Sequence, residues 1–540
     1  MVASPFTPEA ATYRSHRRLD ERSDTPMVTP ADRLPPAPED RAWPMSPEYV
    51  VRAKAGRAIL RDDPHRPRYH ACAPVGWMND PNGAIQHDGR WHLFYQHNPR
   101  AGVHADMHWG YMSSPDLVHW NDHACALRPE DGTYDAQGIW SGNAVIADDG
   151  TPTLFYTGVQ AGPNDRHEHQ LVCIAHVRDG FTRFEKDPGN PVIPATPAGM
   201  DLVQYRDPFV WRGRAGSPNK WLLTIGAGFP GVGGTSLVYG SDDLRHWEYL
   251  HPMAVGDASV REPIWTGIMW ECPDFYEDPT TGKGVLLLNA WDHGVQYVVA
   301  STGDVDRTGT RLVQTKTFAF DGGAFYAPQS FWDAKGRRIQ FGWLRESRPP
   351  SVHGPAGWAG VMSLPRVLRV TPDGRLAGSP APEMAALRRD HVSVVRSVGT
   401  RHGVDLHEAY FELSLRFDAV GTSRSGAWVR CSPDGQEATF VGYDPAAGGL
   451  VVDRSRSSLD HANFLTTSVT PVVIPHGAPF TVRIFGDGSV IEAFIEDSGG
   501  CIANMGDRIY PTRADSLGIE VEGTTFTGGD AWTMADIWQQ

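Results

Sequence analysis

From about residue 70 onward, the hydrophobic residues fall in short runs rich in β-branched and aromatic side chains, and Gly, Pro, Asn or Asp separates each run from the next. Such runs are typical of strands joined by tight turns, and few of them repeat with the 3.6-residue period of a helix. The pattern therefore predicts an all-β region. Its clearest strands are expected at residues 90–96, 153–157, 170–176, 221–225, 284–289, 296–300 and 338–343.

One helix is predicted ahead of this region. Ser46 suits an N-cap, Pro47 suits the first helical position, and Glu48 suits the first turn. We expect residues 46–65 to form this helix and a lead-in to the all-β region. Residues 1–45 are rich in Pro, Asp, Arg and Ser, and they are expected to form a mobile extension.

The all-β region contains a repeat. The pattern Ser-x-Asp-Leu-x-His-Trp occurs at residues 114–120 and again at 241–247, and residues 179–184, midway between them, resemble a degraded copy. The implied unit of about 63 residues holds several short strands, which suits a propeller blade that buries its faces against its neighbours. About five such units fit between residues 66 and 370.

A second β pattern follows residue 366. Phe411, Leu413 and Leu415 alternate with polar residues, which predicts a strand with one buried face, and a hairpin is expected at 480–494 with its turn at 486–488. We therefore predict a five-bladed β-propeller at residues 66–372, a linker at 373–385, and a C-terminal β-sandwich of two antiparallel sheets at 386–540.

The overall charge and the cysteines narrow the classes of partner. The 540 residues carry a formal net charge of −15, which disfavours nucleic acid and anionic membranes and leaves a neutral small molecule as the expected partner. The six cysteines are scattered without CxxC pairs, so we expect free thiols. No segment resembles a signal peptide or a membrane span, which favours a cytoplasmic protein.

Two motifs that could suggest a cofactor or a metal are set aside. Residues 226–231 match GxGxxG but lead into a predicted strand, whereas a dinucleotide site needs a helix at that point. The run His167-Glu168-His169 has the wrong spacing for a zinc-protease helix. We expect no cofactor and no metal.

The most informative short motif is Trp-Met-Asn-Asp-Pro-Asn-Gly at residues 77–83. Pro81 restricts the residue before it to extended geometry, and Asn82-Gly83 can supply the positive φ angles of a tight turn. Asp80 would then be held rigidly just before a strand, as a nucleophile requires. By itself, the motif is equally consistent with an ordinary hairpin turn.

Two further acids occupy similar settings. Asp207 follows Arg206 and precedes a proline, and Glu271 lies between Trp270 and Cys272. Taken separately, they could be a surface ion pair and a buried core acid. All three acids, however, stand at apparent blade starts within two residues of a proline, so a propeller would bring them together at the mouth of its central channel.

Such a group of carboxylates suits glycoside hydrolysis, which needs one acid as nucleophile or base and another as proton donor. The apolar neighbours of Glu271 would keep its carboxyl protonated, whereas Asp80 on a polar turn should remain ionised. Arg206 should hold Asp207 charged, which fits Asp207 to bind sugar hydroxyls.

The motifs Trp-Met-Asn-Asp-Pro-Asn-Gly, Arg-Asp-Pro and Glu-Cys-Pro, in this order and with this spacing, resemble those of glycoside hydrolase family 32, the family of invertases, inulinases and levanases. The resemblance implies a five-bladed propeller followed by a β-sandwich, and cleavage of β-fructofuranosidic bonds by double displacement. It implies that Asp80 is the nucleophile, Glu271 the acid/base and Asp207 the transition-state stabiliser. The expected substrate-binding residues are Trp77, Asn79, Gln96, Trp140, Ser141 and Arg206.

One segment departs from the family pattern. His104 stands where the family usually has Trp, and Tyr111 stands where it usually has His. Stacking against the sugar could therefore differ, although the three acids are intact.

We expect a retaining β-fructofuranosidase that releases terminal fructose from a small oligosaccharide such as sucrose. A fructosyltransferase, a fructan exohydrolase and a sucrose-6-phosphate hydrolase on the same scaffold remain as alternatives. From another class, a non-catalytic sugar-binding propeller is a further alternative, but such a protein would be expected to have lost at least one of the three acids.

Overall fold

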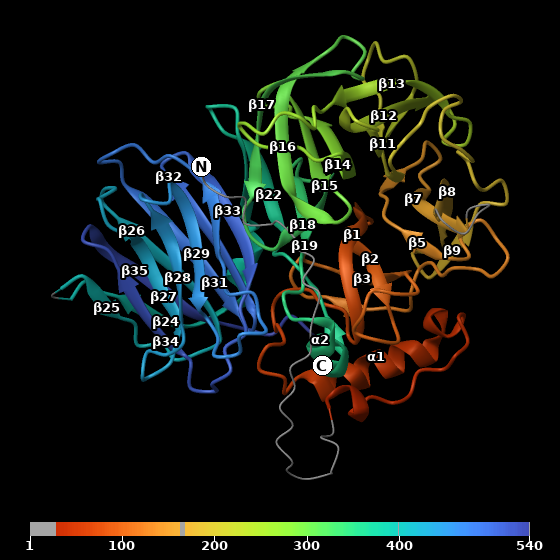
Figure 1. The fold of residues 1–540 in the computed structure, drawn as a ribbon. Coiled ribbons are helices and arrows are strands. Elements are labelled where there is room, and N and C mark those ends of the chain that lie inside the picture. The colour runs from red at the N-terminus through yellow and green to blue at the C-terminus, as the bar shows by residue number, and fades with distance from the viewer. Residues whose placement is uncertain (1–28, 162–167, 398, 539–540) are drawn as a thin grey trace.

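The computed structural model describes residues 29–161, 168–397 and 399–538, and it confirms the predicted all-β architecture (Figure 1). The described residues form five sheets of four or five strands around a common centre, followed by two six-stranded sheets. The five sheets are the blades of a β-propeller. The two larger sheets enclose one apolar core between them and form a β-sandwich.

Within each blade, the strands follow outward in chain order, except that β20 (Trp358–Ala359) pairs with the inner edge of the first strand of the first blade. The first blade has β1 (Gly76–His87), β2 (Arg90–Asn98), β3 (His108–Ser114) and β4 (Asn121–Asp122). The second has β5 (Gly138–Trp140), β6 (Ala144–Ile146), β7 (Pro152–Ala161), β8 (Glu168–Arg178) and β9 (Arg183–Lys186). The third has β10 (Tyr205–Arg212), β11 (Trp221–Phe229), β12 (Gly233–Ser241) and β13 (Glu248–Val255).

The last two blades lie next to the sandwich (Figure 1). The fourth has β14 (Met269–Glu277), β15 (Gly284–Trp291), β16 (Val295–Val305) and β17 (Leu312–Asp321). The fifth has β18 (Phe325–Trp332), β19 (Arg338–Leu344), β21 (Val361–Met362), β22 (Arg366–Val370) and β23 (Leu376–Pro380). Strand β23 therefore falls within the stretch that was expected to be a linker.

The sandwich pairs strands that are distant in sequence. One sheet has the order β24 (Arg388–Val394), β35 (Phe526–Met534), β26 (Tyr410–Phe417), β31 (Phe480–Asp487), β32 (Val490–Asp497) and β33 (Gly500–Arg508). The other has the order β25 (Arg401–Gly403), β34 (Gly518–Glu522), β27 (Ser425–Cys431), β28 (Ala438–Asp444), β29 (Gly449–Arg456) and β30 (Thr467–Pro471).

The predicted strands and hairpin are present. The seven strands lie within β2, β7, β8, β11, β15, β16 and β19. The hairpin consists of β31 and β32, but Asp487 pairs with Val490, so the turn falls at Gly488-Ser489, and Gly488 has a φ of +61°. The predicted turn at 486–488 is therefore too early, because Asp487 is a buried strand residue.

The predicted helix is α1 (Pro47–Leu60). The Ser46 hydroxyl accepts the Tyr49 backbone N–H at 3.3 Å, as an N-cap should. Three short helical elements accompany the strands: η1 (Ala31–Arg33), η2 (Trp43–Met45) and η3 (Pro382–Leu387), together with the short helix α2 (Pro350–Ala356). In the described part of the chain, no helix is long and apolar enough to cross a bilayer.

Residues 29–45 belong to the stretch that composition predicts to be mobile, and they pack against the propeller. Arg100 donates hydrogen bonds to the backbone carbonyls of Pro38 and Asp40, and Trp43 is buried against α1. Arg41 pairs with Asp106 and Asp131. Residues 1–28 lie outside the described part of the chain.

The sequence repeat marks the same place in three blades. It joins β3 to β4 and β12 to β13, and its degraded copy joins β8 to β9. Leu117, Phe181 and Leu244 all have a φ of +66° to +68°, which is unusual for a bulky residue. In the two full copies, the side chains of Asp116 and Asp243 accept two backbone N–H groups each and stabilise this geometry.

The propeller is closed by a strand from its C-terminal end. After β19, the chain crosses to the first blade, where β20 (Trp358–Ala359) pairs in parallel with β1. It then returns to the fifth blade as β21 and β22. The first and last blades are thus joined by backbone hydrogen bonds.

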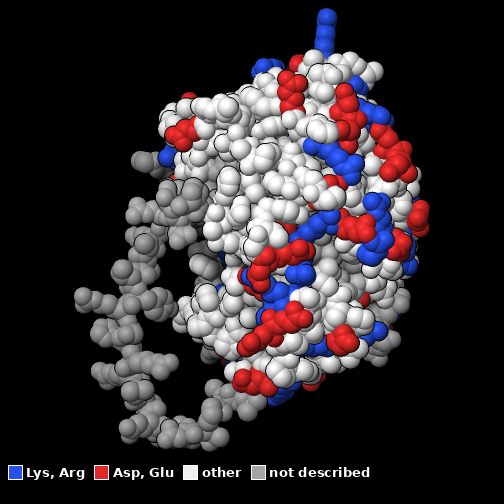
Figure 2. All heavy atoms as spheres, turned by 90° about the vertical axis from the view of Figure 1, so that its right-hand side faces the viewer, with Lys and Arg blue, Asp and Glu red and all other residues white. Residues whose placement is uncertain are grey.

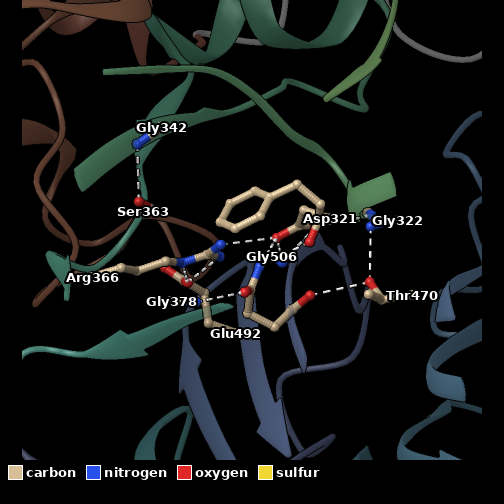
Figure 3. Close-up of polar contacts among 12 residues, drawn as sticks. Asp321, Gly322, Gly342, Ser363, Arg366, Gly378, Thr470, Glu492 and Gly506 are labelled. Carbon is tan, nitrogen blue, oxygen red and sulfur yellow. Dashed lines mark hydrogen bonds and ion pairs between the residues drawn. The ribbon is translucent and has the colours of Figure 1, made fainter. Parts of the chain in front are cut away.

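A buried ionic network lies where this closure meets the sandwich (Figure 3). Arg366 on β22 donates to Glu492 Oε2 at 2.6 and 2.9 Å and to Asp321 Oδ2 at 3.0 Å, and all three side chains are fully buried. His70 lies 2.8 Å from Asp487 and 3.2 Å from Glu492. Burial opposes charge on His70, but these hydrogen bonds raise its pKa above the ordinary value.

The junction depends on Glu492, because this one carboxylate serves both Arg366 and His70. Replacing Glu492 by Gln leaves a buried guanidinium without its main counter-charge, so we expect the variant to lose about 3–5 kcal/mol of stability. Urea unfolding followed by circular dichroism checks this. The control is Glu496→Gln on the same strand, because Glu496 is partly exposed and its pair with Arg483 should contribute only about 0–1 kcal/mol. An unchanged midpoint for Glu492→Gln would contradict the assignment.

Candidate active site

The innermost strands of four blades carry the same irregularity. In β1, β10, β14 and β18, the pairing with the next strand slips at an X-Pro step. Asp207, Cys272 and Ala327 stand directly before the proline and have φ angles of +67°, +44° and +45°. A bulge tolerates a proline, since no ladder hydrogen bond is lost there, and it redirects the neighbouring side chains.

The Asp80 motif lies within β1, which corrects the predicted turn before a strand. Residues 77–83 pair with β2 across two register slips. Gly83 has a φ of +53°, but Asn82 does not have a positive φ. The local signals of Pro and Gly are those of a turn, and here they produce a bulged strand instead.

A cavity of about 250 Å³ opens over these bulges. Eight of the nine candidate residues line it: Asn79, Asp80, Gln96, Trp140, Ser141, Arg206, Asp207 and Glu271. Trp77 does not line it. The Trp77 indole N–H donates to Asn79 Oδ1 at 2.7 Å, so Trp77 supports a lining residue from behind.

The cavity has four more lining residues: His104, Val295, Tyr326 and Trp343. Tyr326 was missed in the sequence, although it stands two residues before Pro328, as Arg206 and Glu271 stand two residues before their own prolines. This shared spacing could have found Tyr326.

Glu271 is held by the residues at the matching positions of the two neighbouring blades. Arg206 Nη2 lies 2.7 Å from Glu271 Oε1, and the Tyr326 hydroxyl donates to Glu271 Oε2 at 2.5 Å. The expected apolar surroundings of Glu271 are therefore wrong. Trp270 points into the core between the third and fourth blades, since successive strand residues face opposite sides.

Asp80 is fixed by polar neighbours. Its Oδ1 accepts from Asn79 at 3.0 Å, and its Oδ2 accepts from the Ser141 hydroxyl at 2.7 Å. Burial raises the pKa of Asp80 above the ordinary value, while these two hydrogen bonds act in the opposite direction. The expected polar surroundings are thus present, but they lie in a buried site.

Arg206 acts on Asp207 in the expected direction, but burial outweighs it. Its Nε is 3.8 Å from Asp207 Oδ2, whereas its terminal nitrogen binds Glu271. Burial raises the pKa of Asp207 to about 7 against the charge of Arg206, which lowers this pKa, and the carboxylates of Glu271 and Asp80 act in the same direction as burial. The Cys272 backbone N–H donates to Asp207 Oδ2 at 3.0 Å.

The Cys272 thiol lies between two of the acids. Its sulfur is 3.6 Å from Asp80 Oδ2 and 3.5 Å from Asp207 Oδ2. Burial raises the pKa of this thiol well above the ordinary value, and the two carboxylates add to the effect. All six cysteines are free thiols, as predicted.

Comparison with known proteins identifies the family. The family model for the N-terminal domain of glycosyl hydrolases family 32 matches residues 70–380, and the model for the family's C-terminal domain matches residues 383–539. The chain belongs to glycoside hydrolase family 32.

Relatives of this family 32 glycoside hydrolase match along most of its length. A sucrose-6-phosphate hydrolase from Escherichia coli is 32% identical over 467 residues, which cover 82% of this chain and 89% of that protein. The crystal structure of fructan 1-exohydrolase IIa from Cichorium intybus has a TM-score of 0.76 at 25% identity and covers 88% of this chain and 99% of its own. A mutant of a Bombyx mori family 32 β-fructofuranosidase in complex with sucrose has a TM-score of 0.74 at 26% identity, and the match covers 91% of this chain and 98% of that chain.

Only one of the two departures from the family pattern touches the cavity of this family 32 enzyme. His104 lines the cavity, with its ring 5.9 Å from Trp77 and nearly perpendicular to it. Tyr111 lies on β3, where it stacks on Phe94 and His123. The change at Tyr111 therefore concerns the packing of the first blade and not the sugar site.

Proposed function

We propose that this family 32 enzyme hydrolyses terminal β-fructofuranosidic bonds, such as that of sucrose, by double displacement with retention. One observation carries the proposal: a single cavity contains Asp80, with a hydrogen-bond donor on each oxygen, and Glu271, held between Arg206 and Tyr326. Two carboxyl groups with distinct partners are what a nucleophile and an acid/base require.

In the first step, a carboxylate oxygen of Asp80 attacks the anomeric carbon of the fructosyl unit, and the bond from that carbon to the leaving oxygen breaks. Glu271 donates its proton to the leaving oxygen. Asn79 and Ser141 support this role, because their hydrogen bonds fix both oxygens of Asp80.

In the second step, Glu271 removes a proton from water, and the water oxygen attacks the same carbon. The bond to Asp80 breaks and fructose leaves with its original configuration. Arg206 and Tyr326 keep the Glu271 carboxyl in place for both proton transfers.

Asp207 is proposed to bind fructose hydroxyls and to stabilise the transition state. Its backbone N–H donates to Thr157 at 2.9 Å, and its Oδ2 accepts from Cys272. These contacts hold the side chain at the cavity wall without using its second oxygen, which leaves Oδ1 available for a hydroxyl donor.

The size of the cavity supports attack on a terminal unit. A volume of about 250 Å³ is small for a ligand site and suits one sugar residue rather than an internal stretch of a polymer. The names of the relatives agree, because they include a β-fructofuranosidase bound to sucrose and an exohydrolase.

Replacing Asp80 by Asn tests the nucleophile. The amide cannot form the covalent intermediate, so we expect kcat on sucrose to fall by more than roughly 1,000-fold, while methanolysis by the wild-type enzyme should give methyl β-fructofuranoside. The control is Asp88→Asn, because Asp88 is 87% exposed in a turn of the same blade. Full activity of Asp80→Asn, or an α-configured methanolysis product, would refute the mechanism.

Replacing Tyr326 by Phe tests the support of the acid/base. It removes one hydrogen bond to Glu271, so we expect kcat to fall roughly 10- to 100-fold, with a shift in the pH profile and a smaller change in KM. Tyr239→Phe is the matched control, since its hydroxyl pairs with Tyr205 and not with the cavity. Identical pH profiles for Tyr326→Phe and wild type would argue against this role.

A substrate panel separates hydrolysis from its alternatives. We expect fructose and glucose as the products from sucrose, with little transfer at high sucrose concentration. Inulin, levan and sucrose 6-phosphate complete the panel, and chromatography of the products checks it. Predominant transfer products would indicate a fructosyltransferase, exclusive cleavage of the polymers or of the phosphorylated sugar would indicate the corresponding hydrolase, and sucrose binding without turnover would indicate a non-catalytic protein.

A further inference from the structure

A second and larger cavity lies away from the active site. Its volume is about 840 Å³, and its walls come from α1, the lead-in to β1, the outer edge of the first blade and the C-terminal segment. Helix α1 lies beside the first blade in Figure 1, and Trp120 in that blade bridges to Trp538 near the C-terminus. None of the residues of the active-site cavity lines it.

The walls of this cavity are basic in an acidic protein. Six cationic side chains line it: Lys54, Arg57, Arg61, Arg66, Arg68 and Arg90. Only two acids do so, Asp122 and Asp536. On the face shown in Figure 2, basic and acidic side chains are intermixed where charges occur. The whole chain has a formal net charge of −15. The cavity lining is therefore positively charged in a protein whose net charge is negative.

Both acids are already paired. Asp122 makes two hydrogen bonds to Arg57, at 2.8 and 2.9 Å, and Asp536 lies 3.2 Å from Arg61. Within the described ranges, no carboxylate lies within 4.0 Å of the charged groups of the other four cations, which are Lys54, Arg66, Arg68 and Arg90. The lining therefore has four positive charges without a counter-ion.

Buried donors in the walls are also unsatisfied. Arg66 is only 3% exposed, and its Nη2 donates to the carbonyls of Ala73 and Pro74, while its Nη1 has no partner in the described structure. Nε of Arg68 and the indole N–H of Trp538 likewise have none there. Such groups are costly to bury, and an anion with several oxygens satisfies them.

We propose that this cavity binds a small molecule that carries one or more phosphate groups. Phosphate oxygens match the fixed N–H groups of arginine. The two tryptophans serve as walls, since Trp120 is only 3% exposed and the Arg57 guanidinium lies over the Trp538 ring, 3.3 Å from its centroid. The site is separate from the one that cleaves the substrate, so the ligand is an effector or a stabiliser and not a reactant.

Calorimetric titration of the full chain with inorganic pyrophosphate, glucose 6-phosphate and ATP tests the proposal. We expect saturable binding with one site per chain, weakened by added salt because the contacts are ionic. Absence of saturable binding by all three probes would overturn the proposal.

The double variant Lys54→Gln/Arg90→Gln locates the site. Both residues are exposed at the rim of the cavity and lie outside the active site. Sucrose hydrolysis in the absence of phosphates should therefore be unchanged. The affinity for the probe that binds best should fall at least roughly tenfold, because two ionic contacts are lost. The matched control, Lys335→Gln/Arg307→Gln, removes the same charge from two distant turns and should bind like wild type.

Two results would contradict the proposed location of the phosphate-binding site. Equal affinity in Lys54→Gln/Arg90→Gln and wild type would exclude this cavity, and loss of binding in Asp207→Asn would place the probe in the active site. If the double variant fails to fold, Lys54→Gln alone changes one exposed side chain on α1 and should give a smaller decrease in affinity. These measurements do not require turnover, so they stand independently of the proposed reaction.

Discussion

The closure of the propeller ring is the constraint on which the rest of the structure depends. Strand β20, from beyond β19, adds to the first blade beside Trp77, only three residues from the proposed nucleophile Asp80. His70 and Arg366 flank the same junction, and Glu492 of the sandwich binds both. A carboxylate shared between His70, which precedes the first blade, and Arg366, which begins β22 of the last blade, resists opening of the ring. The sandwich therefore helps to hold the first and last blades of the propeller together.

The active site follows from closure because its parts come from all five blades. Arg206, Glu271 and Tyr326 stand at matching positions of three successive inner strands, and each is two residues before a proline. The repeated bulge turns each of these side chains toward the same cavity. An opening between the fifth and first blades would separate Tyr326 from Asn79 and Asp80, so the contacts of Glu492 at this junction support the geometry of the cavity.

The sequence predicted what depends on local pattern. The strands, the capped helix, the repeated turns and the meeting of the three acids were available from spacing and residue type, whereas the other lining candidates came from the resemblance to the family. The errors concern partners that meet only in the fold. Asp487 resembles a turn residue, but its carboxylate accepts the backbone N–H groups of Arg68, Tyr69 and His70. The sequence predicted that Arg206 interacts with its neighbour Asp207, but the bulge directs its terminal nitrogen to Glu271 on the next blade.

The surroundings of Glu271 and Asp207 illustrate the same limit. Adjacent apolar residues suggested that a hydrophobic pocket would keep a carboxyl group protonated, yet Trp270 faces the core and Cys272 faces the acids. What the fold supplies instead acts on Asp207. Three carboxylates line one small cavity with a single guanidinium, and burial raises the pKa of Asp207 to about 7. The charges of Glu271 and Asp80 act in the same direction as burial, and the charge of Arg206 acts against it. These groups come from three different blades, so the electrostatic surroundings of Asp207 depend on the convergence of the blades and not on the residues beside it in the sequence.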